Sequence, residues 1–166
     1  MKNTLLLLFA GALAGCSSSQ AAESAKPDVG EPPTSLSSAA DRGVQPGGDE
    51  HFTGDTTVAM LFIPNGPRTF SGAEVTFQPG ARTAWHSHPA GQTLVVTGGN
   101  GWVQIEGGPR HEVSDGDVVW TPPGVRHWHG AKPDAAMTHT ALQGTVADKV
   151  VDWGDKVSDS EYLGKD

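Results

Sequence analysis

The chain has 166 residues, of which 36% are hydrophobic, so it can bury the core of one ordinary domain. Its 22 glycines and 12 prolines favour many short strands and turns over a helical bundle. The formal net charge of -8 excludes the basic surface that nucleic-acid binding requires, and we expect no nucleic-acid partner.

The first residues have the features of an export signal. Lys2 gives a short positive region, and residues 4–14 form an apolar run that is too short for a stable membrane span. The run ends in Leu-Ala-Gly-Cys, which resembles the lipobox of bacterial lipoproteins. The resemblance implies a signal peptide over residues 1–15, a lipid on Cys16, and an exported protein anchored to a membrane, on the periplasmic side or at the cell surface.

Residues 16–50 are rich in Ser, Ala, Pro and Gly and contain almost nothing that would anchor a core. Such a composition predicts a disordered linker, because it cannot bury enough apolar surface to offset the entropy of ordering. The linker begins at Cys16, which is the only cysteine and therefore cannot form a disulfide within the chain. We expect the folded domain over residues 51–166.

Within this domain, short β-type runs alternate with turns rich in Gly, Pro and Asn. The runs cover residues 56–63, 73–78, 93–97, 101–106, 117–121, 126–129 and 136–143. Regular punctuation of this kind predicts an all-β fold, a single antiparallel sandwich or barrel. The tail is the exception, because residues 158–166 predict a short C-terminal helix with Ser158 as its N-cap.

Histidines gather on three segments of the predicted barrel. Residues two apart in a strand face the same side, and this rule groups His86, His88 and Gln92, then His127 and His129, then His139, Ala141 and Gln143. A barrel interior has little use for so many imidazoles unless they bind something, because buried donors and acceptors need partners. A divalent metal is the natural partner. The first pair alone would equally fit solvated histidines on an edge strand.

The spacing of these residues resembles the two motifs of the cupin family. The first motif is matched by Gly80, His86, His88, Gln92 and Gly99, with glutamine where cupins usually carry glutamate. The second is matched by Gly116, Pro122, Gly124 and His127, with Ala131 where the family usually has asparagine. The resemblance implies a jelly-roll barrel that holds one divalent metal on His86, His88, Gln92 and His127.

Gln92 changes the expected chemistry of that metal. A neutral amide leaves the full +2 charge in place, so the ion should be a stronger Lewis acid and harder to oxidise than with a glutamate ligand. Three imidazole nitrogens and one amide oxygen suit manganese best and iron next, and zinc or nickel also accept such ligands.

Three stretches, residues 91–109, 116–131 and 136–144, resemble the small manganese-dependent cupins that act as bacterial hydroxynitrile lyases. The resemblance implies that His139 and Gln143 lie near the metal, that Ala73 and Val75 are small apolar pocket positions, and that the protein is a homodimer. We therefore expect a lyase that splits a cyanohydrin into an aldehyde and cyanide, with His139 as general base. His129 is a candidate second base or holds a water.

Two other functions fit the same residues. One is a metal-dependent dioxygenase of the cupin type, and the other is a non-catalytic lipoprotein that binds a metal or a small ligand. For His139 itself, the alternative to a general base is a buried histidine that is hydrogen-bonded to the barrel. Strand parity also turns Trp85 and Trp128 away from the histidines, so we expect most of the five tryptophans to pack on the outside and not in the pocket.

Overall fold

The computed structural model describes residues 34–165, which form strands, a turn of 3-10 helix and a short α-helix. In chain order the elements are η1 (Ala39–Asp41), β1 (Val44–Pro46), β2 (Phe52–Thr53), β3 (Thr56–Phe62), β4 (Phe70–Phe77), β5 (Arg82–Ser87), β6 (Gln92–Ile105), β7 (Arg110–Ser114), β8 (Val118–Thr121), β9 (His127–Ala131), β10 (Met137–Gly144), β11 (Asp152–Lys156) and α1 (Asp159–Leu163). The predicted signal peptide, Cys16 and most of the predicted linker lie outside the described residues.

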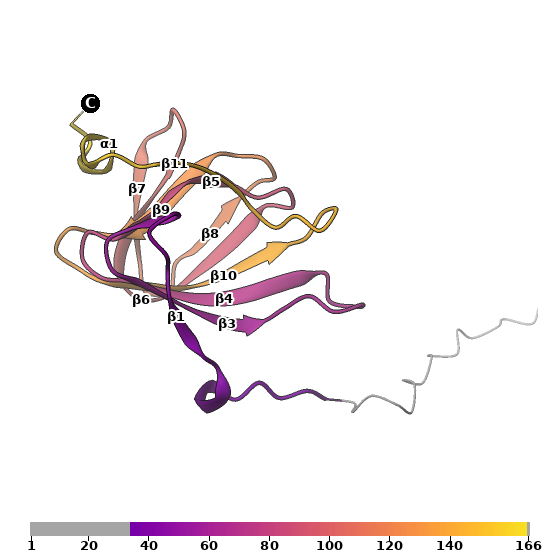
Figure 1. Cartoon of the computed structure of the whole chain (residues 1–166). Coiled ribbons are helices and arrows are strands. Elements are labelled where there is room, and N and C mark those ends of the chain that lie inside the picture. Colours follow the sequence, from indigo (N-terminus) through magenta and orange to yellow (C-terminus); the bar gives the residue numbers. More distant parts are fainter. Residues whose placement is uncertain (1–33, 166) are drawn as a thin grey trace, which may run out of the picture. The chain divides into compact units, whose positions relative to one another are not determined.

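The strands form two layers that face each other (Figure 1). One layer runs β1-β3-β4-β10-β6, with β8 also on β6, and the other runs β11-β5-β9-β6, with β7 on β6 and β2 on β5. All of these pairings are antiparallel. The predicted all-β antiparallel jelly-roll barrel with a short C-terminal helix is thereby confirmed.

Strand β6 connects the two layers, and here the sequence-based boundaries are wrong. The runs 93–97 and 101–106 are one continuous strand and are not separated by a turn. Its first half pairs with β8 and β10, and its second half with β7 and β9. The change of layer takes place at Gly99, whose φ is +76°, where an added Cβ would lie 1.9 Å from the carbonyl oxygen of Ala136. The glycines between the two runs thus mark a bend within one strand and not a turn between two strands.

Four strands were not predicted, because β2 is only two residues long and β1, β7 and β11 carry little hydrophobic pattern. β1 and β11 are exposed along their whole length, and β7 buries only Val113. β1 lies within the predicted linker, yet Val44 pairs with Ala59 of β3. The compact unit that contains the barrel begins at Leu36.

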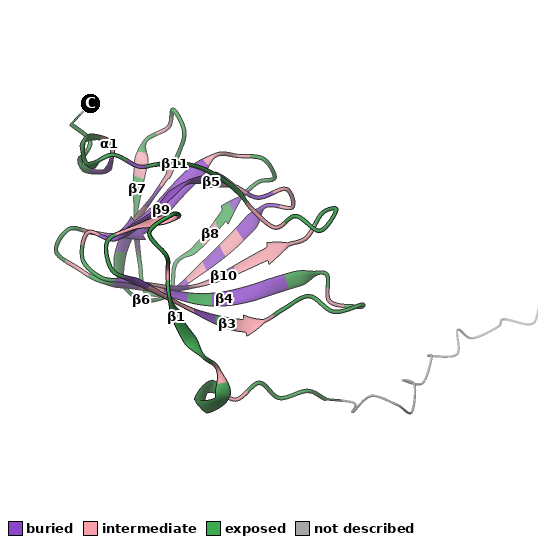
Figure 2. Cartoon of the chain, in the orientation of Figure 1, coloured by how far each residue is buried: buried purple, intermediate pink, exposed green. Residues whose placement is uncertain are grey.

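The apolar core lies between the two layers, on the inward faces of the strands. Figure 2 shows the buried residues concentrated on β4, β5 and β9. A second apolar cluster lies outside the barrel, where Trp85, Trp128 and Val157 pack together with Tyr162 of the C-terminal helix. Trp85 and Trp128 thus pack away from the histidines, as strand parity predicts.

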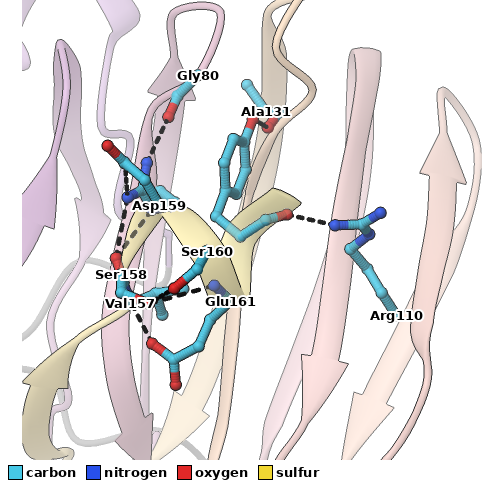
Figure 3. A network of polar contacts seen from close by, with 10 residues as sticks. Gly80, Arg110, Ala131, Val157, Ser158, Asp159, Ser160 and Glu161 are labelled. Carbon is cyan, nitrogen blue, oxygen red and sulfur yellow. Dashed lines mark hydrogen bonds and ion pairs between the residues drawn. The ribbon is translucent and has the colours of Figure 1, made fainter. Parts of the chain in front are cut away.

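Polar contacts fasten α1 to the barrel (Figure 3). Ser158 is the N-cap, as predicted, and forms a capping box in which its hydroxyl accepts from the amide of Glu161 while the Glu161 carboxylate accepts from the amide of Ser158. The buried Arg82 donates to the carbonyl of Val157 at 2.9 and 3.1 Å and to Asp159 at 2.6 Å. Within residues 34–165, no helix has the length and apolar character that crossing a membrane requires.

Candidate metal centre and active site

A cavity of about 170 Å³ opens between the two layers of the barrel. Its polar side chains are His86, His88, Gln92, His129, His139, Gln143 and Thr83. Its apolar wall is formed by Phe52, Val58, Met60, Ala73, Val75, Ala141, Val150, Val151 and Trp153. The cavity therefore combines a cluster of imidazoles and amides with a larger apolar surface.

Two adjacent strands place the central histidines. His86 on β5 is directly opposite His127 on β9, and their ring centroids lie 4.3 Å apart. His129 follows two residues later on β9 and points to the same side. One nitrogen from each of these three buried histidines lies within 4.8 Å of the others. The trio is a candidate centre for a metal ion.

His88 and Gln92 join this centre through a turn and not through a shared strand. β5 ends at Ser87, so His88 lies just beyond it, and Gln92 is the first residue of β6. The intervening turn needs Gly91, whose φ is +76° and where an added Cβ would lie 2.4 Å from the Trp120 ring. His86, His88 and Gln92 therefore do not lie on one strand, as the prediction of a common face assumed, but the turn brings the side chains of His88 and Gln92 to the cavity.

Three of the histidines have a fixed tautomer. The Nδ1 atoms of His86, His88 and His127 lie 3.0, 2.7 and 3.0 Å from the main-chain oxygens of Ala84, Val150 and Val125, respectively. Because a carbonyl only accepts, each Nδ1 must carry the hydrogen, which leaves the lone pair on Nε2. Such second-partner hydrogen bonds are the arrangement that orients metal-binding histidines.

The donor atoms that remain fit a cation. The Nε2 atom of His88 is buried without a partner among the described residues. The Nε2 atom of His127 lies 3.0 Å from Oε1 of Gln92, so two electron-pair acceptors face each other when the amide presents its oxygen. A cation shared by both atoms would satisfy them together. His86, His88, Gln92 and His127 therefore have the chemistry of a metal-binding set.

His129 is bonded differently from these three histidines. Its Nδ1 faces Nε2 of His139 at 3.2 Å, and no carbonyl of residues 34–165 fixes its tautomer. The ring of Phe77 packs beside both imidazoles. The structure thus places His129 in the trio with His86 and His127 and also in a pair with His139.

All of these imidazoles are held in the neutral form. Burial, reinforced by the neighbouring His127, lowers the pKa of His86 well below its usual value, and burial also lowers the pKa of His88. Burial lowers the pKa of His127 and of His139 to about 4. For His129, burial and then the nearby His139 lower the pKa well below its usual value. Neutral imidazole is the form that binds metal ions and accepts protons.

Inward-facing side chains of β4, β10 and β6 are aligned by the register of these strands. Gln143 on β10 is paired with Ser71 on β4 and with Gln92 on β6. One step along, Ala141 is paired with Ala73, and one step further His139 is paired with Val75. The predicted pocket residues of β4 and β10 are therefore neighbours on the cavity wall.

Sequence reasoning missed the part of the wall formed by residues 150–153. Val150 fixes His88 through its carbonyl, and Trp153, paired with His86, lines the cavity. Trp153 is thus an exception among the five tryptophans, most of which were expected to pack on the outside. His51 stacks on Trp153, with ring centroids 4.4 Å apart. No pattern in this stretch marks it as wall, because its position follows from pairing with β5.

Comparison with known proteins agrees with this geometry. Residues 73–140 match the family described as cupin domain. An (R)-mandelonitrile lyase of Granulicella tundricola is 55% identical over 111 residues, which cover 67% of this chain and 85% of that protein. The crystal structure of a cupin-like protein from Thermotoga maritima is 41% identical, with a TM-score of 0.71, and the match covers 77% of this chain and 96% of that one.

A more distant solved structure shares the fold. A cupin-2 domain from Rhodospirillum rubrum is 20% identical, with a TM-score of 0.60, over 81% of this chain and 87% of that one. His86 of the first motif and His127 of the second lie in one buried trio of histidines, and the matched residues 73–140 contain both motifs. The chain belongs to the cupin family.

Proposed function

We propose that this protein is a metal-dependent lyase that splits a cyanohydrin into an aldehyde and cyanide. The observation that carries the proposal is the convergence of buried, neutral imidazoles in one apolar-walled cavity, where a second histidine pair adjoins the candidate metal ligands. The similarity to a protein named (R)-mandelonitrile lyase supports the choice of substrate class.

We assign the metal to His86, His88, Gln92 and His127, because their free donor atoms fit a cation. Manganese is proposed first, since the neutral ligand set leaves its charge undiminished. When bound, such an ion supplies a Lewis acid that makes a substrate hydroxyl more acidic.

The apolar wall is suited to hold the side chain of an aromatic cyanohydrin. Phe52, Met60 and Trp153 offer large surfaces for a ring, and Val58 and Val151 complete the wall. Burial of a ring on this wall removes apolar area from water and excludes solvent from the reacting atoms. The small side chains at Ala73 and Ala141 leave the room that the ring needs.

His129 and His139 form the proton-accepting pair. Each is neutral and therefore carries one hydrogen, and one hydrogen lies between Nδ1 of His129 and Nε2 of His139. If His139 donates, its Nδ1 keeps the lone pair, and if His129 donates, its own Nε2 keeps the lone pair. These two atoms have no partner among the described residues. The pair therefore offers one basic nitrogen at a time, and the assignment of His139 as base requires that His139 donates.

The histidine pair takes the hydroxyl proton of the cyanohydrin, and the oxygen forms the aldehyde C=O as the C–C bond to the nitrile breaks. The electron pair of that bond leaves with cyanide, which receives the proton back as hydrogen cyanide. No oxidant or reductant takes part.

The test is turnover of racemic mandelonitrile by the purified manganese-loaded protein, followed as benzaldehyde and cyanide release with and without oxygen. The proposal expects metal-dependent release that is indifferent to oxygen. No release from fully loaded protein would contradict it. Consumption of oxygen in step with the reaction would instead support the dioxygenase alternative.

We also propose export with a lipid on Cys16, which the apolar run and the Leu-Ala-Gly-Cys ending support. Labelling of cells with a fatty-acid analogue should mark the wild-type protein and leave a Cys16→Ser variant unmarked.

A homodimer is proposed as well, and two exposed hydrophobic side chains on β8, Val118 and Trp120, support an apolar interface. Light scattering of the purified protein tests the mass, and a monomer would contradict the dimer.

A further inference from the structure

Ser71 is an exception in its row of side chains. It is 5% exposed and faces inward on β4 in line with Ala73, Val75 and Phe77, which are all apolar. A hydroxyl in such a place lowers the stability of the fold unless it is hydrogen-bonded. Neither sequence motif includes Ser71, and its burial therefore calls for an explanation.

Both hydrogen bonds of the Ser71 hydroxyl among the described residues go to Gln143, which is the partner of Ser71 in the pairing of β4 with β10. The Ser71 hydroxyl donates to the main-chain oxygen of Gln143 at 3.4 Å. It accepts from the side-chain Nε2 of Gln143 at 3.3 Å. The hydroxyl thus uses its single hydrogen on the main chain and offers its lone pair to the amide nitrogen.

This contact determines which end of the Gln143 amide is used. The nitrogen is directed at Ser71, and Oε1 is buried with no hydrogen-bond partner among the described residues. Gln143 lines the cavity and lies between Ser71 and the candidate ligand Gln92. An unpartnered buried acceptor on a cavity wall is complementary to a ligand that brings a donor.

We propose that Ser71 is a positioning residue, which holds the Gln143 amide with its oxygen available to the cavity and so selects ligands that carry a hydroxyl donor. The identity of that ligand, a cyanohydrin or a related aryl alcohol, rests on the proposed function. A capped ether, which has no hydrogen to donate, leaves Oε1 unsatisfied and binds less well.

The test compares two probes, benzyl alcohol and benzyl methyl ether, by their dissociation constants for the manganese-loaded protein. Quenching of tryptophan fluorescence is a suitable signal, because Trp153 lines the cavity. The ratio of the two constants is measured in wild type and in Ser71→Ala, Ser71→Thr and Gln143→Leu. Comparing ratios between variants of equal metal content removes the part of the preference that comes from the metal or from the extra methyl group.

In Ser71→Ala the side-chain amide of Gln143 can rotate. Its NH2 can then donate to an ether oxygen, just as its Oε1 can accept from a hydroxyl. The preference for the alcohol should fall about three- to tenfold, the value of one hydrogen bond. Ser71→Thr keeps a hydroxyl and should keep the preference. Gln143→Leu should lower the preference for the alcohol to the same extent as Ser71→Ala. The double variant, with both substitutions, should lower it no further.

Thr76→Ala is the matched control. It removes a hydroxyl that pairs across the same two strands, 3.0 Å from that of Thr138, but Thr76 does not line the cavity. Its alcohol preference should equal that of the wild type. An unchanged preference in folded Ser71→Ala, or in Gln143→Leu if the first variant does not fold, would overturn the proposal. Absence of mandelonitrile turnover with the variant pattern intact would overturn the proposed function alone.

Discussion

His86 and His127 are directly opposite each other in the pairing of β5 with β9, with ring centroids 4.3 Å apart. Both donate Nδ1–H to main-chain oxygens, so both direct the lone pair of Nε2 into the protein. Since one belongs to each motif, the pairing of these two strands joins the motifs into one centre.

His127→Ala should therefore abolish stoichiometric metal binding. Loss of a residue that only orients a metal ligand weakens metal binding about 10–100-fold. Loss of the ligand itself should weaken metal binding by at least the same factor. Gln92→Glu should retain the metal, because a carboxylate oxygen replaces the amide oxygen. Elemental analysis after dialysis measures both, with the exposed His111 changed to Ala as control. Undiminished metal in His127→Ala would refute the site.

His88 and His129 are expected to differ in their effect on metal affinity. The tautomer of His88 is fixed by Val150, whereas His129 is engaged with His139. His88→Ala should thus weaken metal binding about 100-fold, and His129→Ala should change it far less. Competition with a fluorescent chelator gives the two affinities. The reverse order would make His129 the ligand, with His86 and His127 as its companions.

The pairing of His129 with His139 predicts non-additive kinetics. Either change to Ala should lower kcat by about 10²–10⁴, the usual contribution of general base catalysis, while metal content stays near that of wild type. The double variant should be no slower than the worse single variant, because the two residues share one basic nitrogen. Thr138→Val, next to His139 on β10 but not on the cavity wall, serves as control. Multiplied effects in the double variant would show that the histidines act independently.

The buried histidines should make the metal-free protein sensitive to acid. Burial lowers the pKa of His127 and His139 from 6.5 to about 4, so above pH 6.5 neither the folded nor the unfolded chain binds a proton there. As the pH decreases from 6.5 to 4, the unfolded chain takes up protons at these histidines and the folded chain does not. The free energy of unfolding therefore decreases with decreasing pH. Each such histidine contributes about 1.4 kcal/mol per pH unit in that window.

Urea unfolding of the chelator-treated protein across this window measures the slope. A His139→Gln variant should show a shallower slope than wild type, because one of the titrating groups is gone. Manganese should restore stability at a given pH, since the ion binds only the folded, deprotonated site. A flat pH dependence in the metal-free protein would contradict the protonation states assigned to the cavity.

The sequence carries the fold wherever a strand buries one face. The runs at β3, β4, β8, β9 and β10 show the alternation or short apolar stretch that predicts a strand, and Ser158 predicts the start of α1. β1, β7 and β11 were missed because edge strands such as β11, exposed at every residue, owe their existence to main-chain pairing and not to a hydrophobic pattern.

Some features of the candidate site are likewise predictable from local sequence patterns, whereas others depend on strand pairing. Spacing places His86 and His127 in motifs, but it does not reveal that Val150 fixes His88, that Trp153 lines the cavity, or that Ser71 holds Gln143. These contacts join residues more than sixty positions apart, or depend on strand pairing that no local pattern encodes. Burial of a lone serine in an apolar row becomes visible only once the strand's inward face is known.

The bend of β6 at Gly99 is open to a direct test. An alanine there would require a positive φ, at a cost of about 1–3 kcal/mol, and its Cβ would lie 1.9 Å from the Ala136 oxygen. Gly99→Ala should thus lower the free energy of unfolding by about 3 kcal/mol or more. Gly98→Ala is the matched control, because Gly98 has no positive φ and an added Cβ meets nothing within 4 Å. It should change stability by no more than about 0.5 kcal/mol.

The same variant connects the bend to the candidate metal centre. Beyond the bend, β6 pairs with β9, where Ile105 is the partner of His127 and Val103 is the partner of His129. If Gly99→Ala displaces this half of β6, the support of both histidines is disturbed, and the metal affinity of the folded fraction should fall while that of Gly98→Ala stays unchanged. Metal titration at a temperature where each variant is folded checks this. Equal affinities in Gly99→Ala and wild type would mean that β5 alone holds β9 in place, through the pairing of His86 with His127.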